Sequence, residues 1–435
     1  MTKNVISISK KMCNNTNLKV ISDYSSNCFL NENQKKILEK MFSKSSIELV
    51  TGSAGTEKTT LIKEFIKNNK HLVILCLTTT NTANNNLKIK DYEIEITYKN
   101  IAKFEREKIH LDYDIIVIDE ASFVSTKSAN LILSTYSSSI ILIAGDSNQI
   151  ESIEFGNWFS LLLAGLKKYN VINVLEQELR TKVKEITNIW KKVKEGKRDD
   201  ILELLSAYDM TEKLHEDIFD IKENEVVLCL NYDGLYGINN INRYLQASNK
   251  NPAYKYQQNL YKVDDPVIFI INDYSDYGIY NNLKGKIVDI LDEEEKITFK
   301  IKLFDEICGC GYLSDELCIK YENDTFYAII EKNKYYTEKY DSDMTTRTKL
   351  PFQISYAMSI HKAQGLEFDS VKIVITKEAD ELINKNIFYT AITRTKKNLK
   401  IYWEPEVANY VLGNLEKETN SNKVDISILK QLALF

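Results

Sequence analysis

The stretch Ile47-Glu48-Leu49-Val50-Thr51-Gly52-Ser53-Ala54-Gly55-Thr56-Glu57-Lys58-Thr59 joins an apolar segment to a Gly-containing turn. Ile47–Val50 predicts a buried strand, and Thr59–Asn68 predicts the helix that follows the turn. In a strand–turn–helix of this kind, backbone N–H groups and the helix N-terminus can surround phosphate groups. Lys58 would then reach the β- and γ-phosphates, and the Thr59 hydroxyl would hold Mg²⁺. The alternative is a chance turn that binds no nucleotide.

Glu57 departs from the pattern G-x-x-x-x-G-K-[ST], which has glycine at this position. A carboxylate beside phosphates repels them, and its side chain crowds the backbone approach that glycine allows. A loss of about 3–4 kcal/mol would weaken nucleotide binding several-hundred-fold. The loop therefore leaves open whether the chain hydrolyses ATP.

The rest of the chain continues the alternation of strand and helix. Short β-branched runs separated by helical stretches predict parallel sheets with helices on both faces. Lys262–Glu331 is rich in strands and turns, which predicts a small β-barrel insert. Apolar spacing over Asn31–Phe42 predicts a helix, and the polar residues 1–25 predict a loosely ordered lead-in. The further predicted strands are Leu72–Leu77, Ile115–Ile118, Ile140–Ala144, Val226–Leu230, Val371–Ile375 and Leu399–Trp403.

The composition is that of a globular protein with more than one domain. At 435 residues, 43% hydrophobic and 27% charged, the chain exceeds one ordinary core. It has no run of about 18 apolar residues and no signal-peptide core at its start, so we expect a cytoplasmic location without membrane contact. Its excess of Lys, Asn, Ile and Tyr indicates an AT-rich genome, bacterial or phage. The net charge of −5 neither announces nor excludes a nucleic-acid partner.

The cysteines do not indicate a disulfide framework, because seven of them are scattered irregularly over the chain. Cys308, Cys310 and Cys318 form a C-x-C-x7-C cluster with no histidine nearby, which does not favour a metal site.

Ile115-Ile116-Val117-Ile118-Asp119-Glu120 is an apolar segment that ends in two acids. A carboxylate at the C-terminal end of a strand beside a phosphate loop can hold Mg²⁺, and its neighbour can polarise an attacking water. The alternative is an ordinary strand whose two acids face solvent.

Longer motifs in the C-terminal half identify a family resemblance. Ser359-Ile360-His361-Lys362-Ala363-Gln364-Gly365-Leu366-Glu367-Phe368-Asp369 resembles motif V of the superfamily 1 helicases, in the 5′→3′ branch that includes RecD and the phage Dda enzymes. Phe388-Tyr389-Thr390-Ala391-Ile392-Thr393-Arg394-Thr395-Lys396 resembles motif VI, and Gly145-Asp146-Ser147-Asn148-Gln149 matches motif III. Asp119-Glu120-Ala121-Ser122 resembles the D-E-A-S box, Leu179-Arg180 falls at motif IV, and Gln34 fits the Q motif. The chain therefore resembles a superfamily 1B DNA helicase of the RecD/Dda kind.

The resemblance implies ATP and Mg²⁺ as cofactors. Lys58 and Thr59 would hold phosphates and metal, Asp119 would ligate Mg²⁺, and Glu120 would be the catalytic base. Gln149 would sense the γ-phosphate, while Arg180 and Arg394 would neutralise charge in the transition state. The other implied nucleotide contacts are Gln34 on adenine, Glu367 on ribose, and Gly52, Gly55, Thr56, Thr60 and Gly365. Outside this family, Gln34 would be a solvated helix residue and Arg180 a surface salt-bridge residue.

The resemblance also implies a track for a single nucleic-acid strand. The implied contacts are Thr78, Thr80 and Asn81 at motif Ia, Thr97 at motif Ib, and Ser359, His361 and Lys362 in motif V. Hydroxyls, amides and a cation suit backbone contacts that ignore base sequence. The alternatives are a Thr/Asn-rich loop that closes a strand and, for His361, a structural histidine. We expect a monomer. Its expected partner is single-stranded DNA, RNA is the alternative, and a protein partner is also possible.

The expected architecture is α/β, with two RecA-like P-loop domains and a small SH3-like β-barrel insert in the second. Asn272-Asp273-Tyr274 and Tyr280–Gly285 resemble the segment that enters this insert. The expected parts are the lead-in 1–25, the first domain 26–180, the second domain 181–255 with 350–435, and the insert 256–349.

Two further features depart from the family. Only about seven residues separate Phe104 from Asp112, where Dda-like relatives place a β-hairpin pin that splits the duplex. Glu151-Ser152 replaces the usual double proline after motif III. Without a pin, translocation or protein displacement is more credible than processive unwinding, and the alternative is a wedge supplied by the insert.

These observations predict an ATP-dependent 5′→3′ single-stranded DNA translocase or helicase. The alternative is a degenerate motor that binds DNA or a protein without turning over ATP. A small-molecule kinase fits the phosphate loop but not motifs V and VI.

Overall fold

The computed structural model divides into two compact units. The first combines Met1–Met210, Ile383–Lys397 and Ala408–Phe435, and the second combines Thr211–Leu382 and Asn398–Val407. The structure describes residues 1–15, 30–41, 45–89, 91, 93–107, 111–150, 157–222, 224–271, 274, 278–307, 309–334 and 349–415. Predictions that concern residues 16–25, 108–110, Glu151, Ser152, Asn272, Asp273 and Cys308 lie outside these residues.

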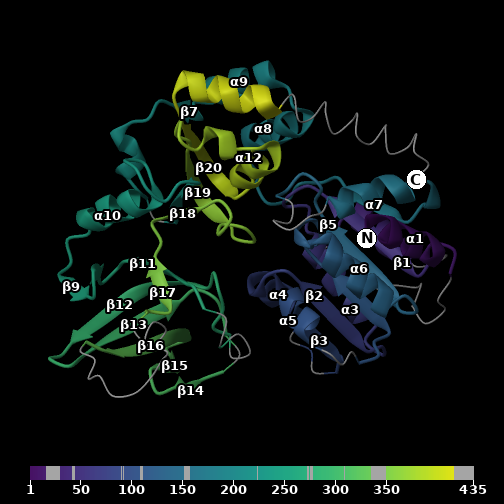
Figure 1. Cartoon of the computed structure of the whole chain (residues 1–435), viewed down its shortest axis with the longest axis horizontal. Helices are drawn as coiled ribbons and strands as arrows, with labels where there is room; N and C mark the ends of the chain where they lie inside the picture. The colour runs from purple at the N-terminus through teal and green to yellow at the C-terminus, as the bar shows by residue number, and fades with distance from the viewer. Residues whose placement is uncertain are drawn as a thin grey trace. The chain divides into compact units, whose positions relative to one another are not determined.

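The first unit is built on a parallel sheet (Figure 1). Its strands are β1 (Ile47–Gly52), β2 (Ile74–Thr78), β3 (Ile96–Asn100), β4 (Ile115–Ile118), β5 (Ile140–Gly145) and β6 (Ile172–Leu175). Their order is β3-β2-β4-β5-β1-β6, and Val50 of β1 lies opposite Ala144 of β5 and Asn173 of β6. The central strands are buried on both faces, which explains their continuous apolar sequence. Because the strands are parallel, the residues that follow β1, β2, β4 and β5 meet at one edge of the sheet.

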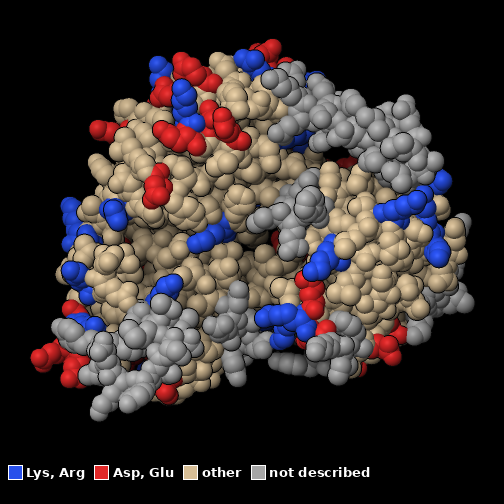
Figure 2. Space-filling model, in the orientation of Figure 1, with Lys and Arg blue, Asp and Glu red and all other residues tan. Residues whose placement is uncertain are grey.

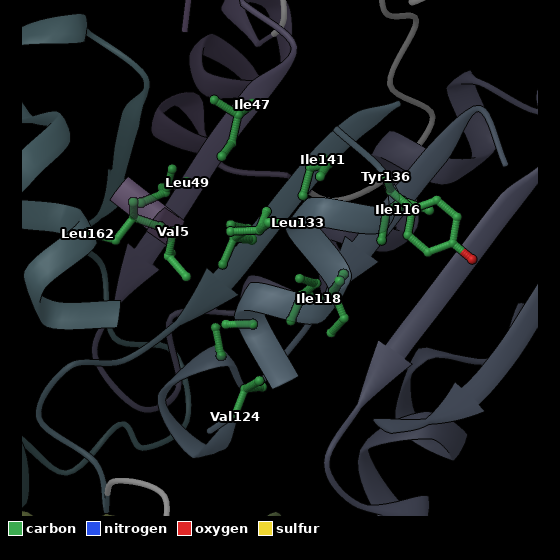
Figure 3. Packing of buried hydrophobic residues seen from close by; sticks show 14 of the residues in the cluster. Val5, Ile47, Leu49, Ile116, Ile118, Val124, Leu133, Tyr136, Ile141 and Leu162 are labelled. Atoms are coloured by element: carbon green, nitrogen blue, oxygen red, sulfur yellow. The ribbon is translucent and has the colours of Figure 1, made fainter. Parts of the chain in front are cut away.

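Helices cover both faces of this sheet, as predicted. One apolar cluster includes Val5, Leu133 and Leu162 against Ile47 and Ile118, as Figure 3 shows. A second apolar cluster lies on the other face of the sheet. There, residues of the helices before and after the phosphate loop pack against the strands. The helices of this unit include α1 (Thr2–Met12), α2 (Glu32–Lys40), α3 (Lys58–Asn68), α4 (Asn81–Leu87), α5 (Ile101–Arg106), α6 (Thr126–Thr135), α7 (Trp158–Leu166), α8 (Lys184–Glu195), α9 (Arg198–Ala207) and α12 (Lys385–Ile392).

The prediction of a loosely ordered lead-in is wrong over Thr2–Met12, which forms α1. Val5 and Met12 are buried against the first sheet's helices, and the Asn4 amide donates to Asn130 of α6 at 2.7 Å. Four apolar residues at helical spacing are enough to bury one face of an otherwise polar helix.

Helices α8, α9 and α12 pack within the first unit, although the predicted boundaries assign them to the second domain. Trp190 of α8 is fully buried, and its indole N–H donates to the Ile392 carbonyl of α12 at 3.2 Å. This contact joins segments about two hundred residues apart in the chain.

The second unit contains a sheet in the order β18-β8-β19-β20-β7 and an antiparallel insert. Strands β18 and β19 both run parallel to β8. Two parallel-sheet α/β parts with a β insert in the second are therefore confirmed. The elements are β7 (Thr211–Glu212), β8 (Glu225–Cys229), α10 (Ile238–Ser248), β18 (Ala357–Ser359), β19 (Phe368–Val374) and β20 (Thr395–Tyr402).

The insert is an antiparallel sheet in the order β14-β15-β16-β13-β12-β11-β17. Apolar residues alternate along its strands, so that Ile297, Phe299 and Ile301 of β13 enter one core. Its elements are β11 (Pro266–Phe269), β12 (Lys284–Asp292), β13 (Lys296–Leu303), β14 (Gly311–Ser314), β15 (Leu317–Glu322), β16 (Thr325–Asn333) and β17 (Phe352–Ile354), with the hairpin β9 (Ala253–Tyr256) and β10 (Asn259–Lys262) before it.

Charges of both signs are interspersed over the face drawn in Figure 2. Among the described residues, no helix is both long and apolar enough to cross a membrane.

Candidate active site

The phosphate loop connects β1 to α3 at the C-terminal edge of the first sheet. The Thr56 hydroxyl donates to the Ser53 carbonyl at 2.9 Å, and the Leu179 N–H donates to the Gly55 carbonyl at 2.7 Å. Gly55 has a φ of +77°, and a Cβ there would lie 2.3 Å from the Cβ of Arg180. The loop therefore needs glycine at position 55 for both its backbone conformation and its packing.

Glu57 adopts the left-handed conformation, with φ 59° and ψ 41°. Its exposed side chain accepts a hydrogen bond from the Thr60 hydroxyl at 2.6 Å. The carboxylate is thus engaged with the first turn of α3, and Thr60, a predicted nucleotide contact, is its partner.

Lys58 is turned back onto the loop. Its ammonium donates to the carbonyls of Gly52 at 2.8 Å and Ser53 at 3.0 Å. Burial lowers the pKa of Lys58, while the carboxylates of Asp146 and Asp119 act in the opposite direction. The lysine thus lies close to both acidic motifs of the sheet edge.

Asp119 and Thr59 form the candidate metal site. The Thr59 hydroxyl donates to Asp119 Oδ2 at 3.3 Å, and Asp119 Oδ1 accepts the Glu120 N–H at 2.8 Å. Burial raises the pKa of Asp119. A hydroxyl and a carboxylate at this separation are oxygen ligands of the kind that Mg²⁺ takes, so the residues fit the predicted cation.

Glu120 is held by two threonines that follow β2. The hydroxyls of Thr79 and Thr80 lie 3.3 and 3.5 Å from Glu120 Oε2. Burial and the charge of Asp119 raise the pKa of Glu120 to about 7, and the charge of Arg394 and the threonine hydroxyls act against this rise. A carboxylate with a pKa near neutrality suits proton transfer from water.

Arg180 lies beside Gly55 of the phosphate loop, and Arg394 lies close enough to Glu120 to act on its charge. Arg394 is buried, its Nε donates to the Thr390 carbonyl at 2.9 Å, and its charge lowers the pKa of Glu120. Arg180 donates from Nη1 to the Thr393 carbonyl at 2.6 Å. The structure therefore brings Lys58, Thr59, Asp119, Glu120 and both arginines to one edge of the first unit.

Tyr389 and Lys194 contact the phosphate loop directly, and sequence reasoning assigned a role to neither. The Tyr389 hydroxyl accepts the Ala54 N–H at 3.3 Å. Lys194 of α8 donates to Ser53 Oγ at 2.5 Å and to Glu178 at 3.0 Å. Tyr389 lies inside the motif VI stretch, which could have drawn attention to it, whereas nothing in the sequence indicates Lys194.

A cavity of about 630 Å³ lies next to the loop. It is lined by Gly52 and Ser53 of the loop, Asp146 and Asn148, and Lys191 and Lys194 of α8, among others. Asp146 is buried, and its Oδ2 has no hydrogen-bond partner in the part of the chain that the structure describes. The cavity is large enough for a small ligand and has polar groups of both signs.

Gln34 and Gln149 occupy different settings. Gln34 is buried in the capping box of α2 with Asn31, and its amide donates to the Thr56 carbonyl at 3.4 Å. Gln34 therefore contacts the phosphate loop and is not a solvated helix residue, while its contact with adenine stays a prediction. Gln149 is half-buried, and its N–H donates to the Asp146 carbonyl at 3.1 Å.

Of the predicted nucleic-acid contacts in the first unit, Thr80 lies next to Glu120. The buried Thr78 hydroxyl donates to the Thr80 carbonyl at 2.8 Å, and Thr80 is the N-cap of α4, which begins at Asn81. Thr97 is half-buried in β3, the outer strand of the described sheet. Thr79, which the prediction omitted, makes the shorter of the two contacts with Glu120.

The remaining predicted residues lie in the second unit. Ser359 ends β18 and its hydroxyl accepts the Lys362 N–H at 3.2 Å, while Lys362 donates to Gln353 at 2.9 Å. His361 lies at the surface, and the partial loss of water around its ring lowers its pKa. Gly365 has a φ of +74°, and Glu367 is half-buried.

Among the described residues, no group of three or more His, Cys, Asp or Glu side chains is arranged to hold a metal ion. Cys310 is exposed and Cys318 is half-buried, both as free thiols.

Two family models match separate parts of the chain. The AAA domain model matches residues 29–216, and the UvrD-like helicase C-terminal domain model matches residues 355–402. Together with the phosphate loop, Asp119-Glu120 and Arg394, they define a helicase-type P-loop protein. The chain belongs to the superfamily 1B helicase family, as a distant RecD- and Pif1-like member.

The curated relatives are remote. The RecBCD enzyme subunit RecD of Mycolicibacterium smegmatis is 24% identical over 67% of this chain and 50% of its own length. The ATP-dependent DNA helicase Pif1 of Campylobacter jejuni is 23% identical over 66% of this chain and 69% of its own length. An uncharacterized protein of Methanocaldococcus jannaschii is 24% identical over 86% of this chain, which spans only 38% of that protein.

Solved structures share the fold. A Pif1 helicase from Bacteroides in complex with ADP-AlF3 and single-stranded DNA aligns with a TM-score of 0.57 and 16% identity, over 91% of this chain and 98% of that one. A Pif1 helicase from Candida albicans aligns with a TM-score of 0.54 and 16% identity, over 90% of this chain and all of that one.

Proposed function

We propose that this chain is an ATP-dependent motor that moves 5′→3′ along single-stranded DNA as a translocase or helicase. The observation that carries the proposal is the meeting of Lys58, Thr59, Asp119, Glu120 and Arg394 at one sheet edge. These are the groups needed to hold phosphates, ligate a cation, activate water and stabilise the charge of phosphoryl transfer.

ATP and Mg²⁺ would occupy the edge next to the phosphate loop. Mg²⁺ supplies charge neutralisation at the phosphates when bound, through Thr59 and Asp119. Glu120 would take the proton of the attacking water, and Lys58 would leave the Gly52 and Ser53 carbonyls to contact phosphate oxygens. A Bacteroides Pif1 structure that holds ADP-AlF3 supports nucleotide binding in this fold.

We also propose single-stranded DNA as the partner and a two-domain architecture for the chain. Two Bacteroides Pif1 structures hold single-stranded DNA, which supports DNA as the partner. We propose that residues 26–180 and 181–255 with 350–435 belong to the two RecA-like domains and 256–349 to an SH3-like insert, although α8, α9 and α12 of the second range pack within the first unit. We further propose that the protein is a monomer that acts in the cytoplasm. RNA and a protein are the alternative partners to be tested together with DNA.

The second candidate is a motor scaffold that binds DNA or protein without hydrolysis. It is favoured by Glu57 in the loop. It is also favoured by Lys58, whose ammonium is engaged with a loop carbonyl, and by Tyr389, whose hydroxyl takes a loop N–H group that a phosphate would otherwise approach. The retention of Asp119, Glu120 and Arg394 around the same edge favours the working motor, because a disused site would not need them.

The test is ATP hydrolysis with and without oligo(dT), or oligo(U), in the unmodified chain, Glu57→Gly and Lys58→Ala. DNA-stimulated turnover that is lost in Lys58→Ala supports the motor. Turnover in Glu57→Gly alone supports the hydrolysis-deficient scaffold. If none of the three proteins hydrolyses ATP although they are folded by circular dichroism, the motor proposal is refuted.

A further inference from the structure

The loop that follows β8, residues Asn231–Gly237, lies at the C-terminal edge of the second unit's sheet. β8 runs parallel to β18, with Cys229 opposite Ser359, and the Ile360 N–H donates to the Cys229 carbonyl at 3.2 Å. The β8 loop and the turn that carries His361 and Lys362 are therefore neighbours. In parallel sheets, ligands bind outside this edge.

The conformation of the β8 loop is fixed by hydrogen bonds. Asn231 Nδ2 donates to the Asp233 carbonyl at 2.8 Å, and Asn240 Nδ2 donates to the Leu235 carbonyl at 2.7 Å. The N–H groups of Ile238 and Asn239 donate to Asn231 and Tyr232 carbonyls at 3.1 and 3.0 Å. Backbone groups in the loop are thus paired within the loop and with the start of α10, which holds it in one shape.

Two glycines make this shape possible. Gly234 has a φ of +94°, and a Cβ at Gly237 would lie only 2.3 Å from the Asp233 carbonyl oxygen. Any other residue at position 237 would force the loop open, so the tight turn is specified by the sequence.

This rigid loop exposes large apolar side chains. Tyr232 is 46% exposed and Leu235 is 67% exposed, whereas the ring of Tyr236 packs 6.2 Å from Phe219. Holding a tyrosine in solvent on a fixed loop removes the ordering cost that a partner would otherwise meet on binding. The arrangement is that of a preformed contact surface.

The surroundings favour nucleic acid as the occupant. Lys362 supplies a cation at the same edge, and the Asp233 carboxylate is engaged by Asn239 Nδ2 at 3.2 Å. A fixed loop that exposes an aromatic ring beside a turn that carries a cation suits an unpaired nucleic-acid strand, because every base has a face that can stack.

We propose that Tyr232 is a stacking platform for a base of the single strand whose backbone the motif V turn contacts. This inference rests on the proposed motor function and adds a residue that no motif match had indicated. Stacking on an aromatic ring is tolerant of base identity, as a translocating motor requires.

The test measures strand binding and stacking separately. Anisotropy of fluorescein-labelled oligo(dT) gives the Kd, and oligo(dT) with 2-aminopurine at successive positions reports stacking as quenched emission. Tyr232→Ala is expected to raise the Kd about tenfold and to abolish quenching at one position. Because no phosphate contact is lost, the slope of log Kd against log salt should stay unchanged.

The matched controls are Tyr232→Trp and Tyr410→Ala. Tyr232→Trp keeps a ring and should retain affinity and quenching. Tyr410 is 43% exposed in the helix over residues 405–415, so its loss tests whether any exposed tyrosine matters.

The outcomes separate this inference from the proposed function. Unchanged affinity and quenching in Tyr232→Ala, with DNA bound by the unmodified chain, would overturn stacking and leave the β8 loop to a protein partner. Loss in both Tyr232→Ala and Tyr232→Trp would also overturn it, because a ring would not suffice. If the unmodified chain binds no strand at all, both the motor and the inference fall.

Discussion

Replacing Tyr389 by Phe removes one oxygen atom from the phosphate loop's surroundings. That hydroxyl accepts the Ala54 N–H at 3.3 Å, and Tyr389 is fully buried. Burial raises the pKa of Tyr389 well above its usual value, so the group is a neutral hydroxyl at any working pH. In the nucleotide-free chain, it occupies a loop N–H of the kind that phosphate oxygens approach.

The size of the effect follows from the cost of exchanging this hydrogen bond. Nucleotide binding must break the bond before a phosphate oxygen takes the Ala54 N–H, and such a bond is worth about 0.5–1.5 kcal/mol net. At 3.3 Å the lower half of that range applies, so Tyr389→Phe should tighten nucleotide binding about two- to fivefold. The same change leaves the buried Ala54 N–H without this partner, which should lower the free energy of unfolding by about 1 kcal/mol.

Titration with a fluorescent N-methylanthraniloyl-ADP measures the affinity, and urea unfolding measures the stability. Tyr113→Phe is the matched control, because the Tyr113 hydroxyl is buried in the same unit without a hydrogen-bond partner among the described residues. It should leave nucleotide affinity unchanged. Weaker or equal nucleotide binding by Tyr389→Phe would refute the reasoning that the hydroxyl competes with phosphate.

Three further predictions concern Glu120, the proposed catalytic base, and the second unit. Burial holds the pKa of Glu120 near 7, so ATP hydrolysis should fall as the pH drops through neutrality and the base becomes protonated. Thr79→Val removes a hydroxyl that lowers the pKa of Glu120, so the acid limb of kcat/KM should move to higher pH at constant Mg²⁺. An unmoved limb would show that this contact has no effect on the pKa of Glu120. Asp265→Ala should lower the free energy of unfolding of the second unit by about 3 kcal/mol or more in urea, because the fully buried carboxylate accepts from Gln246 at 2.6 Å and Tyr356 at 2.9 Å. A loss below about 1 kcal/mol would contradict the reasoning that these buried hydrogen bonds stabilise the second unit.

The strands and the phosphate loop could be predicted because their signals are local. Ile115–Ile118 and Ile140–Gly145 are buried on both faces, and a strand buried in this way is written as an uninterrupted apolar run. The acids after β4 were placed correctly beside the loop for the same reason, since parallel strands bring their C-terminal ends together.

The missing parts of the site depend on contacts between distant residues. Tyr389 meets Ala54 across 335 positions, and Lys194 meets Ser53 across 141. Periodicity reports only which face of an element is apolar, so it cannot say which polar side chain faces which. The buried face of α1 was missed for a related reason. Its few valine, isoleucine and methionine residues are outnumbered by lysine, serine and asparagine, so the segment has a polar composition.

Glu57 shows why a pattern rule can overstate the effect of one residue. The left-handed conformation costs a non-glycine residue about 1–2 kcal/mol, and it persists where the surroundings fix it. Here Leu179 and Gln34 hold the Gly55 and Thr56 carbonyls, and Thr60 holds the carboxylate itself. The backbone requirement for glycine is thus already met in the folded chain, and the strain lowers stability without obstructing the loop. What remains for nucleotide binding is repulsion by an exposed carboxylate, which amounts to about 1 kcal/mol at 4 Å in water. Glu57→Gly should therefore tighten nucleotide binding about fivefold, far less than the several-hundred-fold that the sequence pattern indicates.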